Sequence, residues 1–253
     1  MRYFIKLAYQ GTSYNGWQIQ KNTPRTIQQV INESFSGLLN EKIELTGCGR
    51  TDTGVHAREY YAHFDSTKSD LHINPREWVY KFNVVLPVDI AIQEIIPVQK
   101  DAHARFNALS RSYEYIINKK RDPFQLNRAY YIYFPLRIDL MNKAASILFE
   151  HEDFSCFSKS NTQVKTNFCK ILEASWIENE ELFIFTISAN RFLRNMVRSI
   201  VGTMIEVGKE KISLDDFGKI IENKNRSKAG VSVPAGGLYL TKVKYITGII
   251  PEQ

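Results

Sequence analysis

The stretch of this chain best suited to chemistry runs from Gly47 to Ala57 and reads G-C-G-R-T-D-T-G-V-H-A. It holds almost no bulky apolar side chain, so it can contribute little to a hydrophobic core. Its glycines permit positive φ angles and let another backbone approach closely. Arg50, Asp52 and His56 add charge and the capacity to transfer protons. We interpret the stretch as a site loop.

Three other interpretations of this stretch compete with that of a site loop. Gly, Thr and Asp are common in ordinary turns, but a hairpin turn needs two to five residues. A phosphate-binding G-x-G-x-x-G loop is excluded because its third glycine would fall on Asp52, and no Walker lysine follows. Asp52-Thr53-Gly54 also matches the triplet of aspartic proteases, which need two carboxylates sharing a proton. The chain has no second copy of that triplet; a symmetric dimer would supply one, but Arg50 favours an ionised Asp52 and opposes proton sharing.

The composition is that of an ordinary globular protein with a basic balance. The chain has 253 residues, of which 43% are hydrophobic and 24% are charged, and its net charge is +6. Its sequence pI is about 9.1. This length is enough for one large domain or two small ones. The positive charge favours a polyanionic partner without identifying it.

Cysteine and histidine usage predicts neither disulfides nor a bound metal, and we expect no cofactor. The three cysteines, Cys48, Cys156 and Cys169, form no C-x-x-C pair, and the five histidines show no metal-binding spacing. We find neither a signal-peptide pattern nor a run of about 18 apolar residues. The expected location is therefore the cytoplasm.

The first hundred residues predict a split β-α-β order. Alternation predicts strands at residues 2–9, 43–45, 59–64 and 90–96, and helical spacing predicts helices at 27–39 and 75–82. The order along the chain is therefore strand, helix, two strands, helix, strand. This is the order of ferredoxin-like and RRM-like domains. Trp17, in a glycine-punctuated loop after the first strand, is either a core anchor or a substrate contact.

The second half of the chain predicts another mixed α/β unit. We expect strands at 111–117, 171–177 and 182–188, a helix around 140–148, a loop at 155–167 and a long helix at 190–207. A capping box opens a short helix at Ser213. Lys119 to Pro123 forms a basic turn, either solvated or in contact with RNA. The expected domains are residues 1–105 and 106–253, divided within one continuous sheet.

Five stretches of the chain together resemble the signature of the tRNA pseudouridine synthase A family. Gly49 to Ala57 matches the family's G-R-T-D-x-G-V-H-A segment without a break. The other four matches span nearly the whole chain, at Tyr9–Gln20, Ala104–Tyr115, Asn190–Gly202 and Ala235–Leu240. The resemblance implies a pseudouridine synthase fold of class α/β (α+β type). Two RRM-like or ferredoxin-like halves then form a mixed, mainly antiparallel sheet with helices on one face.

The resemblance also assigns roles to individual residues. Asp52 is implied as the catalytic aspartate, Tyr113 as the residue that contacts the target base, and Arg198 as the partner of Asp52. Leu238 is implied near the base, with an ordinary core leucine as the competing interpretation. Arg50 is a further candidate for stabilising the ionised aspartate. From spacing alone, Arg198 shares a helical face with Arg191 and Arg194 and needs an anionic partner, because it falls among apolar residues.

The implied activity is isomerisation of uridine to pseudouridine at positions 38, 39 and 40 of tRNA, in the anticodon stem-loop, by a homodimer. Asp52 would either add to ribose C1′ or remove the C2′ proton, and the sequence leaves both open. Tyr113 would stack on the base and take its proton directly or through water. The alternative is a non-catalytic RNA-binding protein, for which the chain lacks the aromatic RNP pattern.

Overall fold

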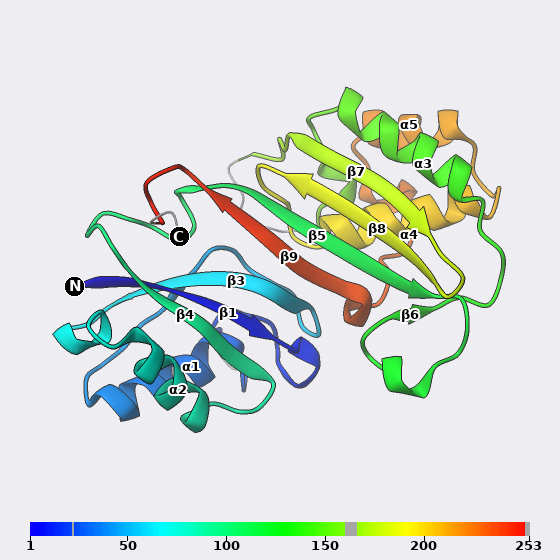
Figure 1. The fold of residues 1–253 in the computed structure, drawn as a ribbon. Helices are drawn as coiled ribbons and strands as arrows, with labels where there is room; N and C mark the ends of the chain where they lie inside the picture. Colours follow the sequence, from blue (N-terminus) through cyan, green and yellow to red (C-terminus); the bar gives the residue numbers. More distant parts are fainter. Residues whose placement is uncertain (22, 160–165, 251–253) are drawn as a thin grey trace. The chain divides into compact units, whose positions relative to one another are not determined.

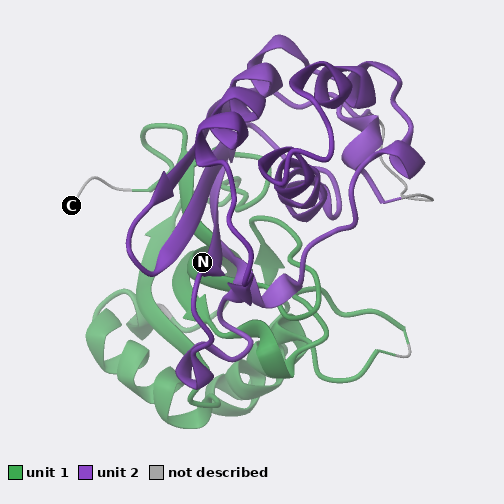
Figure 2. Ribbon diagram, turned by 90° about the vertical axis from the view of Figure 1, so that its right-hand side faces the viewer, with its two compact units in different colours: residues 1–109, 240–253 green, residues 110–239 purple. Residues whose placement is uncertain are grey.

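The computed structural model describes residues 1–21, 23–159 and 166–250, which form two compact units. Unit 1 comprises Met1–Leu109 and Leu240–Gln253, and unit 2 comprises Ser110–Tyr239 (Figure 2). The division expected at residue 105 falls a few residues later. Leu240–Gln253, which the sequence places in the second half, group with unit 1 in the structure.

Unit 1 is built on an antiparallel sheet whose strands follow the order β4-β1-β3-β9 (Figure 1). The strands are β1 (Arg2–Tyr9), β2 (Thr46–Gly47), β3 (His56–Asp65), β4 (Ile90–Val98) and β9 (Leu238–Tyr245). Central strand β1 pairs antiparallel with both β3 and β4, so that Ile5 lies opposite Ala62 on one side and Ile95 on the other. Short β2 pairs with β3.

Two helices cover one face of the unit 1 sheet (Figure 1). They are α1 (Ile27–Leu39) and α2 (Pro75–Val85). Thr26 caps α1 by accepting from the Gln29 N–H, and proline occupies the first turn of α2, where its missing N–H costs nothing. Stacked rings of Phe35 and Phe82, 3.7 Å between centroids, join the two helices in the core. The predicted split β-α-β order is confirmed.

The strand predicted at Ile43–Leu45 is wrong. That segment has no strand partner because side chains of α1 take its backbone groups. The Ile43 N–H donates to Ser36 Oγ at 2.9 Å, the Leu45 N–H donates to Asn32 Oδ1 at 3.0 Å, and Gln28 Nε2 donates to the Leu45 carbonyl at 2.7 Å. Strand pairing begins only at Thr46.

Unit 2 contains the antiparallel strands that follow in the order β5-β8-β7 of the same sheet. Its strands are β5 (Ala108–Asn118), β6 (Tyr130–Tyr131), β7 (Ile171–Glu178) and β8 (Leu182–Ala189). The first two residues of β5 precede the boundary of unit 2. Short β6 pairs parallel with the end of β5. The rings of Trp176 and Phe185 stack at 4.9 Å across β7 and β8.

Three helices pack within unit 2: α3 (Ile138–Ile147), α4 (Met196–Gly208) and α5 (Leu214–Glu222). Helix α3 packs on β7 and on α4. The predicted capping box of α5 is confirmed, with Ser213 and Asp216 bonding reciprocally. Nearly every residue of α4 is buried, so this helix forms the centre of the unit 2 core.

The helix predicted from Asn190 begins only at Met196. Asn195 precedes it with a left-handed φ of 66°, which ends any helical run, and its side chain donates to Ser232 Oγ at 2.6 Å. Asn190 instead directly follows β8 (Leu182–Ala189), and its Oδ1 accepts from the Lys170 N–H. The shared helical face predicted for Arg191, Arg194 and Arg198 is therefore wrong, because only Arg198 lies in the helix.

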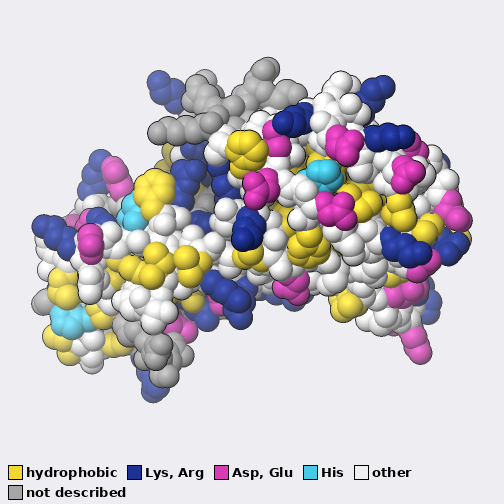
Figure 3. All heavy atoms as spheres, turned by 90° about the horizontal axis from the view of Figure 1, so that it is seen from above, with side chains coloured by type: hydrophobic (Ala, Val, Ile, Leu, Met, Phe, Trp, Pro, Cys, Tyr) yellow, Lys and Arg dark blue, Asp and Glu magenta, His cyan; other side chains and the backbone are white. Residues whose placement is uncertain are grey.

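One face of the chain mixes charged and apolar side chains (Figure 3). On the face shown in Figure 3, Lys and Arg side chains are interspersed with Asp and Glu, and hydrophobic side chains reach the surface in several places. Among the described residues, no helix has the length and apolar character to cross a membrane. Of the loop expected at 155–167, Ser155–Phe157 form one 3-10 turn, and residues 160–165 lie outside the described chain. The α/β fold with mainly antiparallel strands is confirmed.

Candidate active site

The aspartate loop, which we define as Gly47–Ala57, leads from β2 into β3 in unit 1. Asp52 is half-buried, and its carbonyl accepts from the Val55 N–H at 3.1 Å. This bond closes a β-turn whose third residue, Gly54, has a φ of +80°. Because a side chain rarely adopts that conformation, glycine suits this position. Asp52 thus occupies the first position of a tight turn.

Two tyrosine hydroxyl groups fix the loop on either side of Arg50. Tyr60 donates to the Gly49 carbonyl at 2.5 Å, and the Tyr9 hydroxyl lies 2.8 Å from Thr51 Oγ1. Gly49 and Thr51 are the immediate neighbours of Arg50, whose side chain is exposed. The two bonds hold the backbone that presents Arg50 and Asp52.

An aromatic cluster supports these hydroxyl groups from within the core. The rings of Trp17 and Tyr60 stack at 4.0 Å, and the ring of Tyr9 lies 6.0 Å from Trp17 and 5.6 Å from Tyr60. The Trp17 side chain is buried, with the residue only 2% exposed, and the backbone N–H of Trp17 donates to the Thr51 carbonyl at 3.2 Å. Of the two interpretations of Trp17, the structure favours the core anchor.

The loop that follows β1 lies directly against the aspartate loop. Gly16 has a φ of +82°, and a Cβ added there would lie 2.6 Å from the Thr51 carbonyl oxygen. Such a distance is far inside van der Waals contact, so only glycine allows the two backbones to approach this closely. The motif at Tyr9–Gln20 therefore serves as a support for the aspartate loop.

His56 supports the same contact rather than offering a proton. Its ring is 2% exposed, and its Nδ1 accepts from the Gly11 N–H at 3.0 Å. An Nδ1 that accepts from a backbone N–H carries the lone pair of a neutral imidazole. The sequence suggests proton transfer by His56, but in the structure its Nδ1 serves to hold the N-terminal loop in place.

Tyr113 lies in β5 of unit 2, opposite Ile187 of β8. It is half-buried, and its ring meets that of Phe192 edge to face at 5.1 Å and 90°. Two residues further, on the same face of the strand, Tyr115 is fully buried and donates to the Pro234 carbonyl at 2.8 Å. Burial raises the pKa of Tyr115. One face of β5 thus holds a half-buried tyrosine followed by a fully buried one.

Arg198 is half-buried in α4 and is held by the backbone of Val233. Its Nε donates to the Val233 carbonyl at 2.7 Å, and the Val233 N–H donates to the Arg198 carbonyl at 3.2 Å. The reciprocal bonds fix the base of the guanidinium group. Leu238, the first residue of β9, is 6% exposed, which suits both a pocket wall and a core leucine.

Neither thiol nor metal chemistry finds a site among the described residues. No three His, Cys, Asp or Glu side chains of the described chain are grouped to hold a metal ion. All three cysteines are buried, and burial raises the pKa of Cys156 to about 12 and that of Cys169 to about 11. The thiols of Cys156 and Cys169 therefore stay protonated near neutral pH and are poor nucleophiles.

Comparison with known proteins gives a consistent result. A family model described as tRNA pseudouridine synthase matches residues 144–246. The tRNA pseudouridine synthase A of Bacteroides fragilis is 49% identical over 245 residues, which cover 96% of each chain. The chain belongs to the tRNA pseudouridine synthase A family. The namesake protein of Parabacteroides distasonis is 46% identical over 254 residues, 100% of this chain and 99% of that one. That of Clostridium acetobutylicum is 40% identical over 95% of this chain and 98% of that one.

Membership in the tRNA pseudouridine synthase A family confirms the resemblance but does not test the role of any residue. The structure brings Arg50 and Asp52 together in one loop of unit 1. Tyr113, Arg198 and Leu238 belong to unit 2. The expected ion pair between Arg198 and Asp52 joins residues of different units and stays a prediction.

Sequence reasoning missed the residues that position this site. Tyr9 and Tyr60 look like ordinary strand aromatics, since nothing local shows that their hydroxyl groups reach the Thr51 side chain and the Gly49 carbonyl, 42 and 11 residues away. The Val233 carbonyl, 35 residues from Arg198, carries no sequence signal at all.

Proposed function

We propose that this chain is a tRNA pseudouridine synthase, an isomerase that converts uridine to pseudouridine within tRNA. The observation that carries the proposal is the full-length similarity to proteins of that name, with the unbroken G-R-T-D-T-G-V-H-A loop held in a defined conformation. We further propose the anticodon stem-loop, at positions 38, 39 and 40, as the target, a homodimer as the active form, and the cytoplasm as its location.

The reaction rearranges bonds without net oxidation or hydrolysis. The bond from ribose C1′ to uracil N1 breaks, the uracil turns within the site, and C1′ joins C5. The proton on C5 leaves and N1 gains one, so substrate and product are isomers. The site must therefore supply a carboxylate beside C1′, a group that accepts the C5 proton, and walls that retain the detached base.

Asp52 supplies the carboxylate in this proposal. It either adds to C1′ or removes the C2′ proton to give a glycal. Arg50 and Arg198 stabilise the ionised form of Asp52 through their positive charge. Tyr113 stacks on the base, accepts the C5 proton directly or through water, and Leu238 closes the pocket. The target base must first leave its stack, at a cost of a few kcal/mol that stacking and backbone contacts offset.

The decisive experiment measures tritium release from unmodified tRNA labelled at uridine C5. We expect release by the parent protein and a loss of about 10³-fold or more in Asp52→Asn, which keeps the side-chain shape but removes the charge. Asp215→Asn, in the exposed first turn of α5, is the matched control and should release tritium at the parent rate. If tRNA binds but neither protein releases tritium, the chain is a non-catalytic RNA-binding protein and the proposal fails.

A second substrate separates the two roles of Asp52. With deuterium at C2′ of the target uridine, removal of that hydrogen by the carboxylate slows the bond-breaking step. Addition to C1′ leaves the C2′ hydrogen in place, and no primary isotope effect appears in single-turnover rates.

A further inference from the structure

Residues Ala102–Asn107 of unit 1 form a short loop before β5 that projects one aromatic side chain into solvent. We call this segment the Phe106 loop. Phe106 is 74% exposed, although it is large and apolar. The neighbouring Arg105 is exposed as well, and its guanidinium carbon lies 5.7 Å from the centre of the Phe106 ring. The loop therefore displays an aromatic ring and a guanidinium group side by side.

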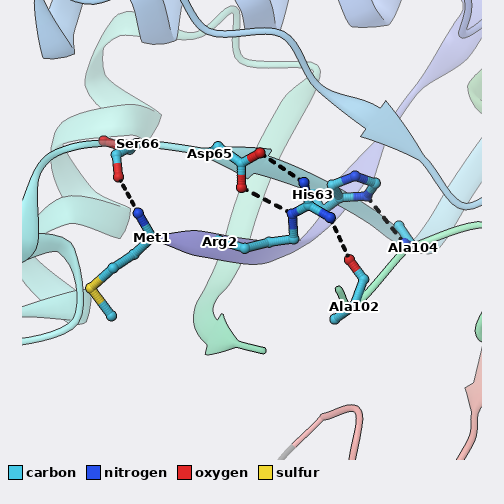
Figure 4. A network of polar contacts seen from close by, with 7 residues as sticks. All are labelled: Met1, Arg2, His63, Asp65, Ser66, Ala102 and Ala104. Atoms are coloured by element: carbon cyan, nitrogen blue, oxygen red, sulfur yellow. Dashed lines mark hydrogen bonds and ion pairs between the residues drawn. The ribbon is translucent and has the colours of Figure 1, made fainter. Parts of the chain in front are cut away.

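Two histidines hold the backbone of the Phe106 loop in a fixed conformation. His63 Nδ1, buried in β3, accepts from the Ala104 N–H at 3.1 Å (Figure 4). His103 Nδ1 accepts from the N–H groups of Arg105 at 3.1 Å and of Phe106 at 3.3 Å. Each ring nitrogen accepts from backbone, so each imidazole is neutral at that atom. The N–H groups of three consecutive loop residues are thus satisfied by side chains.

The carbonyl groups of the loop are tied down as well. Arg2 donates to the Ala102 carbonyl at 3.1 Å while it also pairs with Asp65 (Figure 4). The Tyr245 hydroxyl donates to the Ala104 carbonyl at 2.7 Å. The loop is therefore anchored to β1 and β9, and its exposed ring projects from a fixed backbone.

A column of ring contacts connects Phe106 to the core of unit 1. Buried Phe4 stacks on His63 at 6.0 Å, His63 meets His103 at 4.7 Å, and His103 lies 4.2 Å from Phe106 at an angle of 35°. Phe106 is the outermost ring of the column. The core thus supports the ring from one side and leaves most of it open to solvent.

We propose that Phe106 and Arg105 form a stacking platform for an unpaired base of bound RNA. Flat aromatic rings and guanidinium planes are the groups on which proteins stack unpaired bases, and a guanidinium group also bonds phosphate. Lys100 and Asp101, the exposed residues just before the loop, are charged, which does not suit an apolar protein contact. The platform rests on the proposed function, since that function supplies the RNA.

Asp52 and the platform belong to opposite ends of β3 in unit 1: the aspartate loop starts opposite Ala62, but the Asp52 carbonyl bonds the Val55 N–H, just before β3 begins. His56 is the first residue of β3, and His63, which anchors the Phe106 loop, lies seven residues further along the strand. At about 3.3 Å per residue this separation is roughly 23 Å. The stacked base is therefore not the target uridine but one at another position of the RNA. Stacking of this base therefore strengthens RNA binding and leaves the chemical step unchanged.

A tryptophan introduced at the platform reports stacking directly. The three native tryptophans, Trp17, Trp78 and Trp176, are 2%, 8% and 3% exposed. In Phe106→Trp the added indole is the exposed one, so its red-shifted emission is separable from theirs. We expect quenching of that emission by unmodified tRNA and by a single-stranded oligouridylate, and none by a blunt RNA duplex of the same length. Equal quenching by the duplex, or no quenching by any RNA, overturns the proposal.

Phe106→Ala measures how much the platform contributes. Loss of one base stack should raise the tRNA Kd and KM by about 5-fold to 100-fold, with kcat and the salt dependence of binding unchanged. Tyr80→Ala, at an exposed ring on α2 of the same unit, is the matched control and should leave Kd unchanged. An unchanged Kd in Phe106→Ala overturns the platform, and a loss of self-association instead assigns the ring to a second copy of the chain.

The two proposals fail in different ways. Tritium release by the parent protein tests the pseudouridine synthase assignment and does not involve Phe106. If the parent is active and Phe106→Ala binds tRNA normally, the platform is wrong and the enzyme assignment stands. If the parent is inactive yet the introduced indole is quenched by single-stranded RNA, the platform stands and the enzyme assignment is wrong.

Discussion

The loop that carries Asp52 and the helix that carries Arg198 are held in place by different means. In unit 1, hydroxyl groups of Tyr9 and Tyr60 hold the aspartate loop through side-chain hydrogen bonds. In unit 2, Arg198 is held through backbone groups of Val233, on a segment that crosses α4. The first arrangement is sensitive to the loss of single polar atoms. The second is sensitive to any atom that separates the two backbones.

The largest effect on stability is expected from Gly202→Ala in α4. A Cβ at this position would lie 1.9 Å from the Val231 carbonyl oxygen, so helix and crossing segment must separate. We expect a loss of about 3 kcal/mol or more in the free energy of unfolding, because the clash is with backbone inside a packed core. Urea unfolding measures it, and kcat/KM should fall together with stability.

Gly218→Ala is the control for this substitution. Gly218 also lies in a helix of unit 2, but a Cβ there meets no atom within 4 Å. Alanine should raise the free energy of unfolding by about 0.5 to 1 kcal/mol through better helix propensity. A Gly202→Ala protein as stable as the parent would show that backbone contact does not hold the Arg198 region.

A smaller change in stability, but a clear change in activity, is expected from Tyr60→Phe. The substitution removes only the hydroxyl that bonds the Gly49 carbonyl. We expect the free energy of unfolding to fall by about 1 kcal/mol, the contribution of one hydrogen bond. We expect kcat/KM to fall by about 10-fold to 100-fold, because the aspartate is displaced. Tritium release and urea unfolding of the same preparation separate the two effects.

Tyr3→Phe tests whether that fall is specific. Tyr3 is buried in the same unit, and its hydroxyl donates to the Lys68 carbonyl at 3.0 Å, away from the aspartate loop. It should lose similar stability and keep its activity. Equal activity in the two variants would contradict the positioning role of Tyr60.

The smallest expected effect is a loss of stability at acid pH. Burial lowers the pKa of His63 to about 4, helped by the charge of Arg2 and by His103, while Asp65 opposes the shift. In the unfolded chain a histidine titrates near 6.5. The unfolded state therefore binds more protons between those values, so His63 makes the protein less stable as the pH falls from about 6.5 to 4.

His63→Asn should flatten this acid dependence, because the amide oxygen can accept from the Ala104 N–H without titrating. Hydrogen exchange at pH 7.5 and 5 should show the acid effect in unit 1, which holds four of the five histidines. His151→Asn in unit 2 is the control. The role given to His63 would be refuted if unit 1 of the parent protein exchanged equally at both pH values after correction for intrinsic exchange rates.

Local patterns predicted most elements of the fold. The helix at Ile27–Leu39 and the capping box at Ser213 were both recognisable because their signals lie within a few residues. The errors occurred where distant partners decide the backbone. The sequence of Ile43–Leu45 is typical of a strand, but side chains of α1 form hydrogen bonds with its backbone. The sequence of Asn190–Asn195 is typical of a helix, but Asn195 adopts a left-handed conformation and its side chain bonds Ser232.

The sequence by itself determined the family, the order of the elements and the loop that holds Asp52. Those depend on residue types at fixed short spacings, which a linear chain preserves. Only the tertiary structure decided that Tyr9 and Tyr60 hold that loop, that His56 serves as a backbone acceptor, and that Phe106 lies in solvent on a column of rings. Hydroxyl, imidazole and aromatic groups are satisfied by partners many residues away, so their roles depend on which segments pack together.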